Sequence, residues 1–323
     1  MTEINLPINI GIIGPGRVAD RHARALQQID NVQLWSVAGR VPDDTERFAN
    51  SYGAQAEKNA FTDISEMLFD PQLDAVIIAS PDKLHTDHIL LALAADKSVL
   101  VEKPLCTTLT DGQKIREALH GSAKTFAIGY HLRWHNGLRQ IASTCHTKNW
   151  GPPKHLRLHW AVNFLNDGKW RTNSEYSEWF CLTVLGTHLI DVMRWLMVPL
   201  CGEVVHLTSI VNNSCLKTSF DETVLTSFEF ESGATAEIFC SLTFDSPFRL
   251  ELYADNAVII GDELTGDARR ISINHHPLSF EKNNPYIAQL EDFLLAIRQN
   301  RPTEVGIEEG LMNIKLMRTI RGA

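Results

Sequence analysis

The sequence lacks the features that mark several classes of protein. It has only six cysteines, at positions 106, 145, 181, 201, 215 and 240, and no two of them are close together. This spacing provides neither a zinc knuckle nor a redox pair, and isolated thiols are typical of proteins in a reducing compartment. The N-terminal residues include no basic segment followed by an apolar stretch, so no secretion signal is expected.

Basic residues are in the minority. The chain has 30 Lys and Arg against 39 Asp and Glu, a formal net charge of -9. Proteins that bind nucleic acid through its phosphates need a basic face, so no nucleic-acid partner is expected. The apolar stretch 179–200 contains Asp191 and Arg194, which makes it a poor membrane span. We therefore expect a cytoplasmic protein with no membrane partner.

The histidines and serines give no sign of metal or hydrolase chemistry. None of the 13 histidines forms a helical His-x-x-x-His pair with a third ligand, although His131 and His135 are four residues apart. No serine has the sequence context of a nucleophile elbow. We therefore predict no metal site and no catalytic triad.

The chain has two regions that differ in their pattern of apolar and polar residues. Up to about residue 128, short apolar runs such as Ile8–Ile13 alternate with helical patterns, which predicts crossover connections and a parallel sheet. From 129 onward, segments of alternating polarity follow one another across short turns, which predicts a largely antiparallel sheet. We therefore predict an α/β fold with a dinucleotide-binding domain at 1–128 and a substrate-binding and oligomerisation domain at 129–323.

A glycine fingerprint follows the first predicted strand and opens the first predicted helix. Gly14 suits the tight turn, Gly16 lets the backbone approach a pyrophosphate, and Ala19 keeps the helix close to the strand. Backbone N–H groups at the helix start, around Arg17 and Val18, would face the phosphates. The pattern predicts a Rossmann domain that binds a dinucleotide.

The end of the second predicted strand bears on the choice of cofactor. An acidic residue there accepts hydrogen bonds from the adenosine ribose and favours NAD. This chain has Gly39 and Arg40 instead. A guanidinium can bind a 2′-phosphate, so NADP is slightly favoured over NAD. The alternative is that Arg40 only covers the adenine.

Several short motifs together carry a family resemblance. They are the segments 79–85 (ASPDKLH), 101–105 (VEKPL), 128–134 (IGYHLRW), 169–171 (KWR) and 186–191 (GTHLID). With the glycine loop, they closely resemble the family of glucose–fructose oxidoreductase and myo-inositol dehydrogenase (Gfo/Idh/MocA). The resemblance implies a Rossmann domain plus an α/β domain with an open sheet that often forms the oligomer interface, so a homo-oligomer (dimer or tetramer) is expected.

The resemblance also implies roles for particular residues. Positions that match cofactor contacts are Gly14, Gly16, Ser80, Pro81, His85, Glu102 and Lys103. Lys103 and His188 match the positions that face the reacting carbon, with Lys103 as the proton carrier and His188 orienting the substrate oxygen. Candidates for lining the substrate pocket are Tyr130, Arg133, Arg171, Thr187 and His188. The implied activity is hydride transfer between nicotinamide and a sugar, polyol or related cyclic alcohol or ketone.

One departure from the family leaves alternatives open. Many catalytic members have an aspartate one helical turn before the histidine, where this chain has Val184. Asp191, three residues after His188, could orient the imidazole instead. The rival interpretations are a non-catalytic dinucleotide sensor on the same scaffold, and a lyase or hydrolase that uses a tightly held NAD for transient oxidation.

Overall fold

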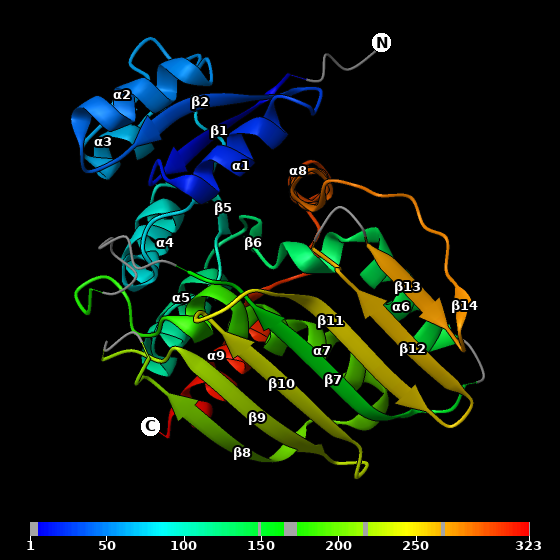
Figure 1. Cartoon of the computed structure of the whole chain (residues 1–323). Coiled ribbons are helices and arrows are strands. Elements are labelled where there is room, and N and C mark those ends of the chain that lie inside the picture. The colour runs from blue at the N-terminus through cyan, green and yellow to red at the C-terminus, as the bar shows by residue number, and fades with distance from the viewer. Residues whose placement is uncertain (1–5, 148–149, 165–172, 216–218, 266–268, 323) are drawn as a thin grey trace. The chain divides into compact units, whose positions relative to one another are not determined.

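The computed structural model describes residues 6–147, 150–164, 173–215, 219–265 and 269–322. The chain divides into two compact units (Figure 1). Unit 1 comprises Met1–His131 and Asn284–Ile314, and unit 2 comprises Leu132–Asn283 and Lys315–Ala323. The sequence-based division at 128 places the segment after 283 with the second domain, whereas in the structure a long part of that segment belongs to unit 1.

Unit 1 is built on a parallel sheet, as predicted. Within the described residues it has six strands in the order β3-β2-β1-β4-β5-β6, and every neighbouring pair is parallel. The strands are β1 (Ile8–Ile13), β2 (Val32–Ala38), β3 (Ala60–Phe61), β4 (Ala75–Ile78), β5 (Ser98–Val101) and β6 (Phe126–Ile128). The chain order reverses between β1 and β4, and dinucleotides bind at this switch point in such sheets.

Two helices of unit 1 begin at residues whose side chains cap them. The Thr108 hydroxyl accepts from the N–H of Asp111 at 3.0 Å and begins α5 (Leu109–His120). Asn284 caps α8 (Pro285–Gln299) by accepting from the N–H of Tyr286 at 3.0 Å. The other helices of this unit are α1 (Arg17–Leu26), α2 (Pro42–Ser51), α3 (Ile64–Leu68), the short η1 (Asp82–Leu84) and α4 (His85–Ala94).

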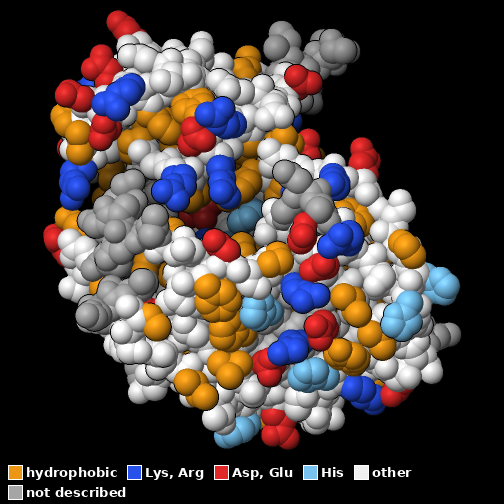
Figure 2. All heavy atoms as spheres, viewed as in Figure 1, with side chains coloured by type: hydrophobic (Ala, Val, Ile, Leu, Met, Phe, Trp, Pro, Cys, Tyr) orange, Lys and Arg blue, Asp and Glu red, His pale blue; other side chains and the backbone are white. Residues whose placement is uncertain are grey.

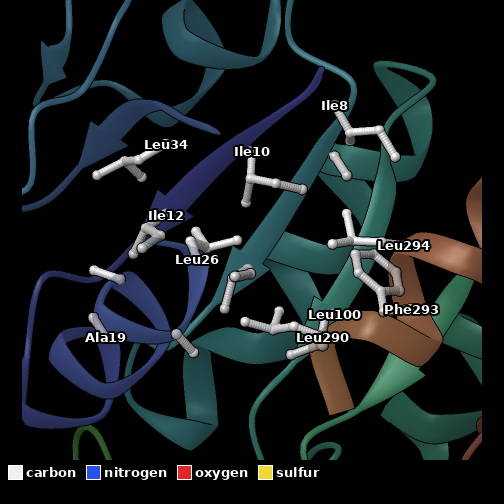
Figure 3. Packing of buried hydrophobic residues seen from close by; sticks show 14 of the residues in the cluster. Ile8, Ile10, Ile12, Ala19, Leu26, Leu34, Leu100, Leu290, Phe293 and Leu294 are labelled. Carbon is white, nitrogen blue, oxygen red and sulfur yellow. The ribbon is translucent and has the colours of Figure 1, made fainter. Parts of the chain in front are cut away.

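The core of unit 1 joins residues from the two ends of the chain (Figure 3). Alternate residues of β1, Ile8, Ile10 and Ile12, point to one side of the sheet, as the period of a strand requires. On that side they share a buried cluster with Leu290 and Phe293 of α8. α8 is therefore part of the Rossmann core.

Unit 2 is built on a mixed, mainly antiparallel sheet. Among the described residues its order is β14-β13-β12-β11-β7-β10-β9-β8. The strands are β7 (Pro153–Ala161), β8 (Val204–Asn212), β9 (Thr223–Phe230), β10 (Thr235–Ser241), β11 (Ser246–Ala254), β12 (Ala257–Asp262), β13 (Arg270–Ile273) and β14 (His276–Pro277). The prediction of a largely antiparallel sheet is confirmed. The exception is the parallel pair of β7 and β10, which the long connection between these strands allows.

The two faces of this sheet differ in polarity. Leu156 and Leu158 of β7 are buried on the face that packs against α7 (Thr187–Cys201). The opposite face carries charged and histidine side chains among hydrophobic ones (Figure 2), including an ion pair of 3.0 Å between Arg157 and Glu237. The remaining helices of the chain are η2 (His131–Trp134), α6 (Asn136–Thr147), the π-helical η4 (Leu182–Gly186) and α9 (Ile307–Arg321).

The segment Leu182–Cys201, formed by η4 and α7, is long and apolar enough to cross a membrane by length and composition. In the structure 72% of its most apolar window is buried inside the protein. It also contains Asp191 and Arg194, both buried. This burial is that of a core helix in a globular protein.

Candidate functional site

Gly14 is required by the local backbone and by packing. Its φ angle of +92° is unfavourable for any residue with a side chain. A Cβ atom on Gly14 would also lie 2.7 Å from the backbone nitrogen of Ser80. The first glycine therefore brings the loop after β1 into direct contact with the end of β4.

Gly16 has a different role, because packing does not require it. A Cβ atom on Gly16 would meet nothing within 4 Å. The residue is the N-cap of α1 and makes no side-chain capping bond, and Arg17 beside it is exposed while Val18 is half-buried. The start of α1 thus has no side-chain cap and has open space beside Gly16, which suits the binding of a pyrophosphate as in Rossmann domains. These residues fit a dinucleotide.

The end of β2 lies against the glycine loop. A Cβ atom on Gly39 would lie 2.5 Å from Thr45 Oγ1 and 2.6 Å from Cδ of Pro15, so only glycine fits there. Arg40, the next residue, is exposed. The structure therefore places a guanidinium group at the strand end that normally reads the adenosine ribose.

The loop after β4 is held by two histidines. The Ser80 hydroxyl is 2.9 Å from Nδ1 of His88. The ring nitrogens of His85 lie 2.8 Å from the carbonyl oxygen of Pro104 and 2.9 Å from that of Ser80. Burial lowers the pKa of His85, against the effect of these bonds, and burial with the charge of His85 lowers the pKa of His88 to about 4. His85 thus ties the Ser80-Pro81 loop to the segment after β5, and its contact with a cofactor stays a prediction.

Glu102 and Lys103 follow β5 directly. The Glu102 carboxylate is buried and 2.8 Å from Nε2 of His22, which lies on α1. A Cβ atom on Gly129 would lie 3.0 Å from the same carboxylate oxygen, so glycine at this position makes room for the acid. Lys103 is half-buried. The contact of Glu102 with His22 was not expected from the sequence.

The predicted cofactor residues of unit 1 thus gather at one edge of its sheet. The loops after β1, β2, β4 and β5 all leave from the carboxyl ends of parallel strands, which is the edge where such sheets bind ligands. Tyr130, a predicted substrate contact, follows β6 at this edge and is buried, with its N–H donating to Ile128 over 2.8 Å.

In unit 2, Arg133 and Asp191 form a buried ion pair. Nε and Nη2 of Arg133 each donate to a carboxylate oxygen of Asp191 over 2.8 Å. The guanidinium carbon of Arg133 also lies 5.9 Å from the ring centroid of Trp195. Both oxygens of Asp191 accept from Arg133, so the pair links η2 to α7. A role for Arg133 in substrate binding stays a prediction.

Thr187 and His188 occupy the first turn of α7, directly after the π-helical turn η4. Both side chains are buried, and the His188 ring centroid is 6.1 Å from that of Trp160. Turns of π-helix are rare and are frequent at functional sites. Val184 lies one turn earlier and is half-buried, so the position of the family aspartate is apolar here.

Asp221 fixes the start of this helical segment. It is buried and accepts from the N–H groups of Phe180 at 3.0 Å and Leu182 at 2.7 Å. Arg321 of α9 also donates to it over 3.3 Å. Burial raises the pKa of Asp221, against these bonds. Neither its spacing nor its neighbours in the sequence signalled this role.

Two further predictions concern Arg171 and metals. Arg171, with the motif 169–171, lies outside the residues that the structure describes. Among the residues that are described, no group of three or more His, Cys, Asp or Glu side chains could hold a metal ion.

Comparison with known families agrees with this architecture. Residues 8–130 match the profile of the oxidoreductase family with an NAD-binding Rossmann fold (GFO_IDH_MocA). Residues 138–260 match that of the GFO/IDH/MocA C-terminal domain. The two matches cover the greater part of the chain and extend over both units.

Similar proteins include dehydrogenases of sugars and polyols. The chain is 28% identical to glucose-6-phosphate 3-dehydrogenase of Bacillus subtilis over 67% of its own length and 61% of that enzyme. It is 22% identical to myo-inositol 2-dehydrogenase of Thermotoga maritima over 96% of its length and 94% of that enzyme. It therefore spans about three fifths of the Bacillus relative and almost all of the Thermotoga one.

Solved structures share the fold at lower identity. The aldose–aldose oxidoreductase of Caulobacter crescentus superposes with a TM-score of 0.90 at 19% identity, covering 98% of this chain and 97% of that one. A levoglucosan dehydrogenase in complex with NADH gives a TM-score of 0.83 at 17% identity, covering 98% and 96%. With both domain profiles matched in order along the sequence, the chain belongs to the GFO/IDH/MocA family of oxidoreductases.

Proposed function

We propose that the protein is an NAD(P)-dependent oxidoreductase that transfers a hydride between nicotinamide and a sugar, polyol or related cyclic alcohol or ketone. The observation that carries the proposal is the open, uncapped start of α1 at Gly16, held beside the end of β4 by Gly14. The dehydrogenase names of the relatives support the substrate class.

The preferred cofactor in this proposal is NADP. Arg40 offers a positive charge and a planar set of donors where an NAD-specific protein has a carboxylate. The levoglucosan dehydrogenase of the same fold holds NADH, so the choice rests on Arg40 alone.

Lys103 and His188 are the proposed catalytic residues. The nicotinamide supplies the hydride acceptor or donor when it is bound. Lys103 exchanges the proton of the substrate hydroxyl or carbonyl oxygen, and His188 orients that oxygen by a hydrogen bond. Tyr130, Arg133, Arg171 and Thr187 are proposed to line the substrate pocket. The ion pair with Asp191 gives Arg133 a fixed position for this role.

Val184 supports a second candidate function. Because the family aspartate is replaced by an apolar residue next to His188, a dinucleotide sensor without turnover would also fit the chain. A tightly held NAD that is oxidised and reduced within one catalytic cycle would fit as well. Retention of the cofactor through purification distinguishes this last case.

The proposal also includes an oligomeric state and a cellular location. We propose a homo-oligomer that forms through the open face of the eight-stranded sheet, where Arg249 pairs with Asp262 at 3.1 Å and Phe244 is exposed. Six free cysteines suit a cytoplasmic location. Sedimentation velocity of the purified chain tests the assembly.

A fluorescence titration with NADPH and with NADH tests the proposed function. We expect saturable binding with preference for NADPH, followed by cofactor turnover in a screen of sugars, polyols and cyclic ketones. Binding of both nucleotides without turnover in a broad screen would favour the sensor. Binding of neither, with no nucleotide released on denaturation, would contradict the oxidoreductase.

A further inference from the structure

A buried acid that follows β5 meets a buried histidine of α1 in unit 1. Glu102 is 5% exposed and His22 is completely buried. The distance of 2.8 Å between Nε2 of His22 and Oε1 of Glu102 is that of a hydrogen bond in which the ring N–H donates to the carboxylate. The other carboxylate oxygen accepts from the N–H of Lys103 at 3.3 Å.

The side chains around this pair come from α8, η2 and α1. The ring of Tyr286 on α8 stands edge-on to His22, with centroids 5.2 Å apart, and stacks on His131 of η2 at 4.5 Å. Arg21 of α1 donates to the Tyr286 hydroxyl over 3.3 Å. The charged or titratable groups that interact with Glu102 are His22, Lys103, His131, Tyr286 and His85.

Of the acidic groups in this cluster, only Glu102 carries a negative charge at physiological pH. Burial lowers the pKa of His131 to about 3 and raises the pKa of Tyr286 to about 12, so both are neutral at physiological pH. Burial alone raises the pKa of Glu102, but the hydrogen bond from His22 and the positive charge of Lys103 bring it below its usual value. Glu102 is therefore ionised.

The topology places this anion on the nicotinamide side. In the proposed function the glycine loop after β1 holds the pyrophosphate, and Arg40 after β2 lies on the adenosine side. β4 and β5 lie on the other side of β1, so the nicotinamide half belongs over the strand ends that carry Ser80, Glu102 and Lys103.

We propose that Glu102, held in place and ionised by His22, is a fixed negative charge that makes the site bind the oxidised nicotinamide more tightly than the reduced one. His22 is then a positioning residue that acts through Glu102. The inference rests on the proposed dinucleotide function and adds to it a role for two residues of this chain. Its physical basis is that the oxidised ring carries a positive charge and the reduced ring carries none.

The measured quantity is the ratio of the dissociation constants of NADPH and NADP+, from isothermal titration calorimetry of the full chain. Glu102→Gln keeps the shape and removes the charge, so the ratio should fall roughly fivefold or more. Fivefold is the order expected for two unit charges about 4 Å apart when they are screened as strongly as in water, with a dielectric constant of about 80. Glu117→Gln, at an exposed position on α5, is the matched control and should leave the ratio unchanged.

His22→Asn and His22→Gln separate the two parts of the proposal. The Gln amide reaches about as far as Nε2 and restores the donor, whereas the Asn amide is too short. Without the donor, the effect of burial is opposed mainly by the charge of Lys103, so the pKa of the carboxyl should rise. In His22→Asn the ratio should therefore fall as the pH is lowered from about 8.5 to 6, while the wild type and His22→Gln stay level.

Each outcome decides the proposal. An unchanged ratio in Glu102→Gln, with both nucleotides bound, would overturn it and leave the dinucleotide function intact. A level ratio in a folded His22→Asn would remove His22 from the proposal. If His22→Asn does not fold, Glu102→Gln still carries the test. Absence of binding by the wild-type chain would overturn the dinucleotide function itself, and with it this inference.

Discussion

Arg133 and Asp191 hold each other through two parallel hydrogen bonds of 2.8 Å, and both side chains are buried. Because Asp191 lies three residues after His188, the pair fixes α7 close to the proposed catalytic histidine. The sequence suggested that Asp191 could orient His188. In the structure both of its oxygens accept from Arg133, and a direct contact of Asp191 with His188 stays a prediction.

Breaking this pair should be costly. Arg133→Met leaves a buried carboxylate without its partner, so the free energy of unfolding should fall by about 3–5 kcal/mol. The double variant Arg133→Met, Asp191→Leu should recover part of the loss. Urea denaturation measures both. The exposed pair of Arg47 and Asp44 is the control, since Arg47→Met should cost less than about 1 kcal/mol. Equal costs at the two pairs would contradict the role given to Arg133.

The two glycines of the fingerprint should respond differently to alanine. Gly14→Ala forces a side chain into a positive φ and against the Ser80 backbone, so it should destabilise the fold by about 1–3 kcal/mol. Gly16→Ala meets nothing and should change stability by less than about 1 kcal/mol. It should nevertheless weaken NADPH binding roughly tenfold or more, which is 1.4 kcal/mol or above. Thermal unfolding and nucleotide titration of both variants decide; unaltered binding by Gly16→Ala would show that the loop does not hold the pyrophosphate.

Removing the proposed proton carrier should stop turnover and spare binding. Lys103→Ala is expected to lower kcat by a factor on the order of a hundred or more, because proton transfer loses its donor and acceptor. The dissociation constant for NADPH should change little. Lys114→Ala, at an exposed position on α5, is the control in the same assay. Full activity of Lys103→Ala would show that another group carries the proton.

Arg40 should act on NADPH selectively. Arg40→Ala removes the guanidinium proposed to bind the 2′-phosphate, so the affinity for NADPH should fall roughly tenfold or more while that for NADH stays within about twofold. Arg47→Ala on α2 provides an exposed arginine as a control. Equal losses of affinity for NADPH and NADH would contradict recognition of the 2′-phosphate by Arg40.

His131 should make the fold sensitive to acid. Its pKa is lowered by burial from 6.5 to about 3, so the unfolded chain takes up a proton that the folded chain does not. The contribution of neutral His131 to the free energy of unfolding is complete above about pH 6.5. It is lost as the pH falls toward about 3, by about 1.4 kcal/mol per pH unit. The difference in the free energy of unfolding between the wild type and His131→Gln should therefore become smaller as the pH is lowered from 7 to about 4.5 in urea titrations. A difference that stays constant with pH would contradict this prediction.

Local patterns in the sequence predicted most of the fold. Apolar runs such as Ile8–Ile13 and the alternation of β9 and β10 gave strands at the observed positions, because strand periodicity is a local property. β3, with two residues, and the short β13 and β14 were not foreseen, since so few residues carry no clear period.

Contacts between distant residues could not be predicted in the same way. His22 and Glu102 are 80 residues apart, and Arg133 and Asp191 are 58 apart. No pattern in one sequence pairs such positions, because packing brings them together only after the sheets have formed. The parallel pairing of β7 with β10 has the same origin.

The place of α8 in the core has a consequence during synthesis. Ile8, Ile10 and Ile12 leave the ribosome well before their partners Leu290 and Phe293, which follow about 280 residues later in the chain. At roughly 5–20 residues per second, unit 2 is translated in between over on the order of ten seconds. Throughout that time the nascent Rossmann sheet has one incompletely covered apolar face, which is closed only when α8 has been synthesised.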